Sequence, residues 1–230
     1  NGDWSSDVCS SDLFSSFFSV FNKSTFRPAK NVSPSHRAFG SFETIKQTLG
    51  ANNLEETVKC PPGRDVNDWL AMNVVEFYNQ LNIFYSIVET DCNEKTCPHM
   101  SAGKFQYFWQ DDDKYKRPSD LPAHKYMELL MDWINEMLND TKVFPDVTYI
   151  PYPSDFRKTV QKIFRRMFRV YAHIYFQHKN SMKEINGMGH LNTSFRHFYL
   201  FSKEFKLMDP KEYQVLQPII DQFNSRDRKS

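Results

Sequence analysis

The strongest hydrophobic pattern in this chain runs from Asp155 to His178. Apolar residues recur there every three or four positions, which places their side chains on one face of an α-helix. They are Val160, Ile163, Phe164, Met167, Tyr171, Ile174 and Tyr175. The pattern predicts a helix that buries this face in the core of the protein.

A second long helix is predicted from about Asp65 to Val88, with Asp65 or a neighbour capping its first turn. Its apolar stripe comprises Trp69, Leu70, Val74, Phe77, Leu81, Phe84, Tyr85 and Val88. The opposite side carries the acidic residues Asp68 and Glu76. These acids can form a binding surface, but their spacing alone favours a solvated helix face.

Three further helices complete the pattern. One begins near Pro122, because proline is favoured at the first helical position. Its apolar residues are Tyr126, Leu129, Leu130, Trp133, Ile134, Met137 and Leu138. The next is predicted to start at a cap within 192–194 and to contain Phe195, Phe198, Phe201 and Phe205. The last begins at Asp209 and Pro210, with Glu212 in its first turn.

One short segment has the character of a strand. The aromatic run at 106–110, followed by the acidic turn at 111–113, predicts a small β-hairpin. No internal repeat occurs along the chain. Together, the predicted helices and the hairpin indicate an all-α protein, a single-domain helical bundle with a small β-hairpin.

Composition narrows the functional classes. The 230 residues fit one domain, and aromatic residues make up 16% of them, which is enough for a large core. Lys and Arg total 29 against 28 acidic residues, so any anion-binding surface must be local. No apolar run approaches the roughly 20 residues that a membrane-spanning helix needs, and no secretory signal pattern is present. We therefore expect a cytoplasmic protein.

The two ends of the chain differ from its body in composition. Residues 1–13 are Ser/Asp-rich and match one translated frame of a common sequencing-adapter oligonucleotide, so we treat them, with Cys9, as non-native. Residues 14–50 are basic and rich in Ser, Thr and Asn, which predicts a flexible regulatory N-terminal arm. An inert tail is the alternative interpretation. The helical domain is expected over 51–224, followed by a polar tail at 225–230.

Two pairs of candidate metal ligands lie far apart in the sequence: Cys92 with Cys97, and His173 with His178. Two thiolates and two imidazoles suit a tetrahedral Zn²⁺ ion, and both spacings lie near the usual range. A buried cysteine pair and two ordinary histidines are the alternative. Residues five apart on an ideal helix lie about 140° apart around its axis. Both histidines can therefore reach one ion only if the helix ends or is distorted near His178.

The same motifs argue against an enzyme. Four protein ligands leave zinc no open position for a substrate, and the chain has no His-Glu-x-x-His motif. No nucleophile paired with a base and no phosphate-binding loop can be recognised. A zinc ion here is expected to join a loop to a helix as a structural element.

A basic stripe follows the central helix. Lys158, Lys162, Arg165 and Arg169 recur at intervals of four, three and four, so they share one face, with Arg166 beside them. Crowded like charges repel one another, and an anionic partner would relieve that cost. Arginine suits phosphate recognition, which favours a phosphorylated peptide. Nucleic acid and a merely solvated face are the alternatives, and the near-zero net charge counts against nucleic acid.

Five separated motifs occur in an order that resembles the Mob (Mps-one-binder) kinase-activator family. They are Pro61-Pro-Gly-Arg-Asp-Val-Asn-Asp-Trp-Leu70, Phe77-Tyr-Asn-Gln-Leu-Asn82, Cys97-Pro-His-Met-Ser-Ala-Gly103, Met167-Phe-Arg-Val-Tyr-Ala-His-Ile-Tyr175 and His190-Leu-Asn-Thr-Ser-Phe195. The arm, with Ser24-Thr-Phe-Arg-Pro28 and Thr48-Leu-Gly50, is most similar to the first subgroup of the family.

The resemblance implies a non-enzymatic adaptor with a helical-bundle fold and a structural zinc. Such adaptors bind the N-terminal regulatory segment of nuclear-Dbf-related and large-tumour-suppressor (NDR/LATS-type) kinases. They also dock phosphorylated upstream kinases or scaffolds in Hippo-type or mitotic-exit signalling. A monomer is the default expectation, and the expected localisation extends to the nucleus and to spindle poles or the division site. A zinc-stabilised nucleic-acid-binding protein is the competing hypothesis.

The resemblance also assigns residues. The zinc ligands of the family fall on Cys92, Cys97, His173 and His178. Its phosphopeptide-binding residues fall on Arg165, Arg166 and Arg169, its kinase-facing acids on Asp68 and Glu76, and its phosphorylation sites on Thr25 and Thr48. Two positions depart from the family pattern. Arg64 stands where an acid is usual, and Phe176 stands where many members have a histidine that is not an expected ligand.

Overall fold

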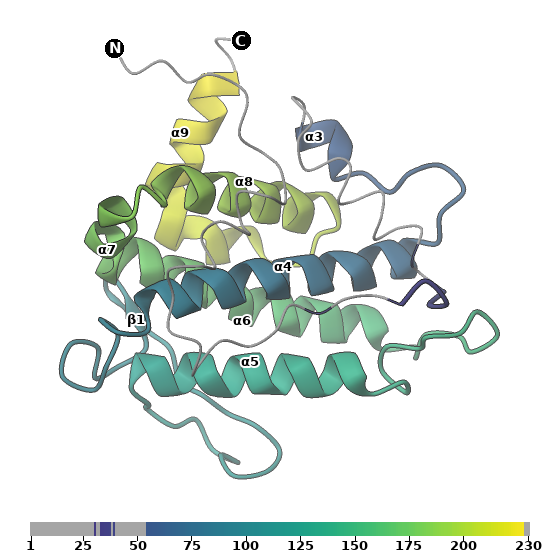
Figure 1. Ribbon diagram of the computed structural model, residues 1–230, viewed down its shortest axis with the longest axis horizontal. Coiled ribbons are helices and arrows are strands. Elements are labelled where there is room, and N and C mark those ends of the chain that lie inside the picture. Colours follow the sequence, from purple (N-terminus) through teal and green to yellow (C-terminus); the bar gives the residue numbers. More distant parts are fainter. Residues whose placement is uncertain (1–29, 31–32, 38, 40–53, 228–230) are drawn as a thin grey trace.

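The computed structural model describes residues 30, 33–37, 39 and 54–227 of the protein. Four long helices form a bundle in this part of the chain (Figure 1). They are α4 (Val66–Val88), α5 (Ala123–Asn139), α6 (Phe156–Gln177) and α8 (Met188–Glu204). The shorter elements are α3 (Leu54–Thr57), β1 (Ser101–Ala102), β2 (Phe105–Gln106), α7 (Lys179–Glu184), the 3-10 helix η1 (Pro210–Leu216) and α9 (Gln217–Asp227). None of the described helices is long and apolar enough to cross a membrane.

The all-α, single-domain class predicted from the sequence is confirmed, and α6 is the central helix of the bundle. It packs against α4, α5, β1 and η1, and Figure 1 shows it behind α4 and α5. All seven apolar residues of its predicted stripe are buried. Phe168, Val170 and Ala172 are buried as well, so the contact surface of α6 is wider than its stripe predicts. The ring of Phe168 meets Tyr213 of η1 edge to face at 5.8 Å.

A cluster of phenylalanine rings joins three of the long helices. Phe77 of α4 lies edge to face with Phe164 of α6, with ring centroids 5.6 Å apart. Phe198 of α8 stacks on Phe164 at 4.9 Å and meets the edge of Phe77 at 5.2 Å. Edge-to-face and stacked pairs at these distances add to the stabilisation that burial provides. The cluster therefore fixes α4, α6 and α8 against one another.

The start of α4 agrees with the predicted cap, whereas the start of α8 does not. The carboxylate of Asp65 accepts hydrogen bonds from the backbone N–H groups of Asn67 and Asp68. Helix α8 begins at Met188, so the predicted cap at 192–194 is wrong and lies inside the helix. The Ser194 hydroxyl donates instead to Gln80 of α4, at 2.5 Å, and shares a hydrogen bond with the Tyr171 hydroxyl.

The predicted hairpin is present with a different pairing. Strand β2 pairs with β1 on its N-terminal side, and Gly103 between them has a positive φ of 56° that glycine adopts without strain. The acidic turn at 111–113 instead lies within a loop closed by an isolated bridge between Trp109 and Ser119. The last helical segment has the predicted capping box at Asp209, but it starts as η1 and continues as α9 to Asp227, beyond the predicted domain end at residue 224.

Candidate metal centre and basic surface

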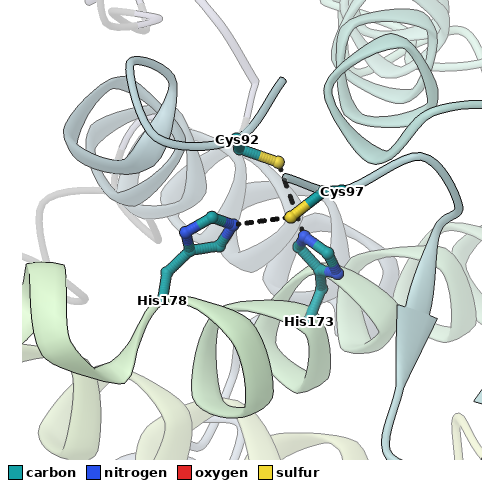
Figure 2. A group of neighbouring side chains, drawn as sticks. All are labelled: Cys92, Cys97, His173 and His178. Carbon is teal, nitrogen blue, oxygen red and sulfur yellow. Dashed lines mark hydrogen bonds between the residues drawn. The ribbon is translucent and has the colours of Figure 1, made fainter. Parts of the chain in front are cut away.

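The four predicted metal ligands meet at one buried site (Figure 2). Cys92 and Cys97 lie in the loop between α4 and β1, while His173 lies on α6 and His178 directly follows that helix. Figure 2 shows both sulfur atoms and both imidazole rings turned towards a common centre. Residues 81 apart in sequence are thereby brought into contact.

The distances within the site fit a tetrahedral ion. The Cys92 Sγ to His173 Nε2 distance and the Cys97 Sγ to His178 Nε2 distance are both 3.5 Å. A tetrahedral zinc ion with ordinary bond lengths separates a sulfur ligand from a nitrogen ligand by about 3.6 Å. One ligand atom from each of the four residues lies within 4.8 Å of the others. The residues present can therefore hold one metal ion.

The end of α6 resolves the angular problem raised by the histidine spacing. Helix α6 ends at Gln177, and His178 follows with φ −119° and ψ 22°, outside the helical range. This change of backbone direction turns the His178 ring towards His173, and the ring centroids lie 5.2 Å apart. The expected helix end near His178 is confirmed.

Hydrogen bonding and burial determine the protonation of the four donor residues. The Nδ1–H of His173 donates to the Ser101 carbonyl oxygen at 2.8 Å, which leaves Nε2 free to face the cysteines. Burial lowers the pKa of His173 to about 4 and also lowers the pKa of His178, so both rings are neutral ligands at pH 7. Burial, and then the nearby Cys97, raise the pKa of the Cys92 thiol. A bound cation would favour the thiolate form against this effect.

The three arginines predicted to bind phosphate have different environments. Arg165 is exposed, and no described residue forms an ion pair with it. Arg169 is half-buried and donates to the Tyr126 hydroxyl at 2.7 Å, with its guanidinium 5.2 Å from the Tyr107 ring. Arg166 is only 9% exposed. Of these three arginines, one is therefore exposed and two are held by aromatic residues.

Arg166 is fixed between two tryptophan rings. Its guanidinium carbon lies 4.3 Å from the ring centroids of both Trp109 and Trp133. Its Nη2 donates to the Gln110 carbonyl oxygen, and its buried Nη1 has no hydrogen-bond partner among the described residues. Burial lowers the pKa of Arg166. Sequence reasoning did not identify the two tryptophans as partners of Arg166, although the position of Trp109 in the aromatic run at 106–110 was a possible signal, since aromatic rings stack on arginine.

The acids predicted to face a kinase already have partners within the chain. Asp68 is 13% exposed in its side chain and accepts from Arg37 Nε at 2.8 Å and from the Tyr152 hydroxyl at 2.9 Å. Glu76 accepts from Gln80 Nε2 at 2.7 Å. Sequence reasoning did not identify Arg37, a basic residue of the arm whose side chain is 9% exposed. A partner that uses Asp68 must therefore compete with Arg37.

The remaining predicted positions are placed as follows. Arg64 is exposed in the turn before α4. Phe176 is 48% exposed, and a Cβ atom on Gly103 would lie 3.1 Å from its ring, so a side chain at this turn would displace the ring slightly. Thr25 and Thr48 lie outside the described residues.

The structure defines the class of protein. It is a helical bundle in which α6 and the loop between α4 and β1 meet at a buried Cys2His2 centre. The chain belongs to the Mob1/phocein family, whose family model matches residues 46–216. The family resemblance of the five motifs is thereby confirmed.

Relatives in plants, animals and fungi support this membership. The chain is 44% identical over 201 residues to MOB kinase activator-like 1A of Arabidopsis thaliana, which covers 87% of this chain and 94% of that protein. It is 42% identical over 201 residues to MOB kinase activator 3A of Homo sapiens, with coverage of 86% and 93%. It is also 42% identical over 205 residues to maintenance of ploidy protein mob1 of Schizosaccharomyces pombe, with coverage of 89% and 97%.

Proposed function

We propose that the protein is a non-enzymatic adaptor that activates NDR/LATS-type protein kinases and docks phosphorylated upstream partners in Hippo or mitotic-exit signalling. Family membership and the printed names of the kinase-activator relatives support the activating role. The observation that supports the docking role is the Nη1 of Arg166, which has no hydrogen-bond partner in the described part of the chain and lies beside the exposed Arg165. Buried arginine N–H groups without an acceptor suit a phosphate oxygen brought by a ligand.

We further propose that the Cys2His2 centre holds Zn²⁺. Thiolate and imidazole donors in a tetrahedral arrangement are the usual set for structural zinc. All four donor residues are buried, so their ion would be shielded from solvent and would not meet a substrate. The ion would hold the loop 92–97 against the end of α6, and the adaptor surfaces would lie on the fold that this junction stabilises.

The docking surface is tested by replacing Arg165 with Ala. Arg165 is exposed and has no ion pair among the described residues, so Arg165→Ala should leave the melting temperature unchanged. Binding of phosphothreonine peptides should weaken by about ten-fold, because one charge-assisted hydrogen bond is lost. Fluorescence anisotropy with phosphorylated and unphosphorylated peptide libraries measures the change. Arg64→Ala, at an exposed arginine before α4, is the matched control and should bind normally. Equal binding of phosphorylated and unphosphorylated peptides would reject the docking role.

The second surface of the adaptor is proposed to lie along α4 and to be covered by the arm. Asn79 of α4 donates to the Lys30 carbonyl oxygen at 3.0 Å and accepts from the Lys30 N–H at 2.7 Å. Arg37 holds Asp68 and also donates to the Ile150 carbonyl oxygen at 2.6 Å. A basic helical segment of the kinase would take the place of Arg37 on Asp68, with Glu76 as a further contact. Phosphorylation at Thr25 or Thr48 would shift the population towards the released arm.

Replacing Arg37 with Ala tests this competition. The variant removes the positively charged partner of Asp68 and leaves, of the described residues, only the Tyr152 hydroxyl bonded to its carboxylate, so affinity for a basic kinase segment should rise by about 3- to 10-fold. Isothermal titration calorimetry with an N-terminal regulatory peptide of an NDR/LATS-type kinase measures it, and Thr48→Glu should act in the same direction. Lys59→Ala breaks the exposed pair with Glu56 and serves as the control. An affinity that is unchanged or lower in Arg37→Ala would contradict the proposed release.

A further inference from the structure

Two lysines continue the basic surface beyond the three arginines. Lys158 and Lys162 are exposed on α6, and neither forms an ion pair with any described residue. Asp155, three residues before Lys158, makes no ion pair with it either. With Arg165 and Arg169, the lysines fall within an arc of about 60° around the helix axis. The cations therefore form one continuous row along α6.

The row is unfavourable for the isolated helix. Lys158 lies in the first turn of α6, where the helix dipole disfavours a positive charge, and this turn contains no acidic residue. Like charges one turn apart add to the cost. The two lysines contribute nothing to the buried face of the helix. An anion bound beside the two lysines would offset both the unfavourable helix dipole and the repulsion between like charges.

The Trp133 ring contacts both Lys162 and Arg166 of the proposed phosphate site. The Nζ of Lys162 lies 5.3 Å from the centroid of the Trp133 ring, which also contacts the Arg166 guanidinium at 4.3 Å. Asp111, an acid whose charge acts on Arg166, accepts hydrogen bonds from the Trp109 Nε1–H at 2.7 Å and from backbone N–H groups. The Asp111 carboxylate therefore already accepts hydrogen bonds from donors within its own loop.

We propose that Lys158 and Lys162 form a second anion subsite that binds acidic or phosphorylated residues of the docked phosphopeptide. This inference rests on the proposed docking function and specifies its ligand. Lys158 lies about 10 to 16 Å along α6 from the arginines, and Lys162 lies about 4 to 10 Å from them. An extended peptide advances about 3.3 Å per residue, so an anion that reaches Lys158 lies three to five residues from the phosphothreonine. A peptide suits this site better than nucleic acid, because the row is a single helix stripe on a chain of net charge +1.

The test compares four peptides with the same phosphothreonine. One has only neutral residues around it, two carry a pair of Glu residues three to five positions before or after it, and one carries a second phosphothreonine at that spacing. Anisotropy is measured with the full chain and with Lys158→Ala/Lys162→Ala. Lys142→Ala/Lys183→Ala, at two exposed lysines on other elements, is the control with the same change in charge.

The Glu-containing or doubly phosphorylated peptide is expected to bind about 3- to 10-fold more tightly than the neutral one at low salt, and only Lys158→Ala/Lys162→Ala should abolish this advantage. Phosphate-dependent binding with no such advantage, or an advantage that survives in this variant, overturns the subsite while leaving the docking function intact. Absence of phosphate-dependent binding to any peptide overturns both. Tighter binding of duplex RNA or anionic vesicles through the same lysines would replace the peptide as the partner.

Discussion

Replacing Cys97 with Ser is expected to lower the melting temperature of the protein by about 10–20 °C. Structural zinc contributes about 10–16 kcal/mol in small domains that have no other core. This protein retains a large aromatic core, so we expect a loss of about 5 kcal/mol, and each kcal/mol lowers the melting temperature of a domain this size by about 2–4 °C. Calorimetry should show the shift, and mass spectrometry should show one zinc ion per chain before the substitution and none after it.

Cys60→Ser is the matched control for this experiment. Cys60 is half-buried, its thiol donates to the Pro61 and Arg64 carbonyl oxygens, and it does not belong to the four-residue metal site. Its replacement should change the free energy of unfolding by less than about 0.5 kcal/mol. Chelation of the wild-type metal should reproduce the effect of Cys97→Ser. If the wild-type protein folds without metal, and if Cys97→Ser is as stable as Cys60→Ser, the protein has no structural zinc.

Long hydrophobic periods predict this fold well because many residues contribute to each of them. The bounds of α4 and α6 agree with the pattern, and so does the cap at Asp65. Short polar signals are less informative. Ser194 has the chemistry of a cap, but its partners Gln80 and Tyr171 lie 114 and 23 residues away. A local sequence window therefore cannot distinguish a capping hydroxyl from one that bonds across the bundle.

The candidate sites likewise depend on long-range contacts that a local sequence window does not show. Ligand type and spacing in the sequence identify a possible zinc set, but its assembly depends on α6 ending before His178. The charge pattern identifies Arg166, whereas its burial between Trp109 and Trp133 depends on two other parts of the chain. The sequence alone suggests that Asp68 is unpaired, because its partner Arg37 lies 31 residues earlier in the chain. Long-range contacts thus decide which charges are available to a partner.

A buried histidine is expected to make the protein less stable in weak acid. His197 of α8 lies against Phe77, with ring centroids 4.8 Å apart, and burial lowers its pKa to about 4. The same side chain has a pKa of about 6.5 in the unfolded chain. Between these two values the unfolded state binds a proton that the folded state does not, so stability falls as the pH falls from 7 towards 4.

Comparison of the wild type with His197→Phe isolates this effect. From pH 7.5 to pH 5, the wild type should lose about 2 kcal/mol more of its free energy of unfolding than the variant, as measured by urea denaturation. Acid also weakens metal binding, but that loss occurs in both proteins and cancels from the difference. His99→Phe, at an exposed histidine paired with Asp120, should retain the excess loss. Identical pH dependence in wild type and His197→Phe would show that the buried ring does not titrate between the two states.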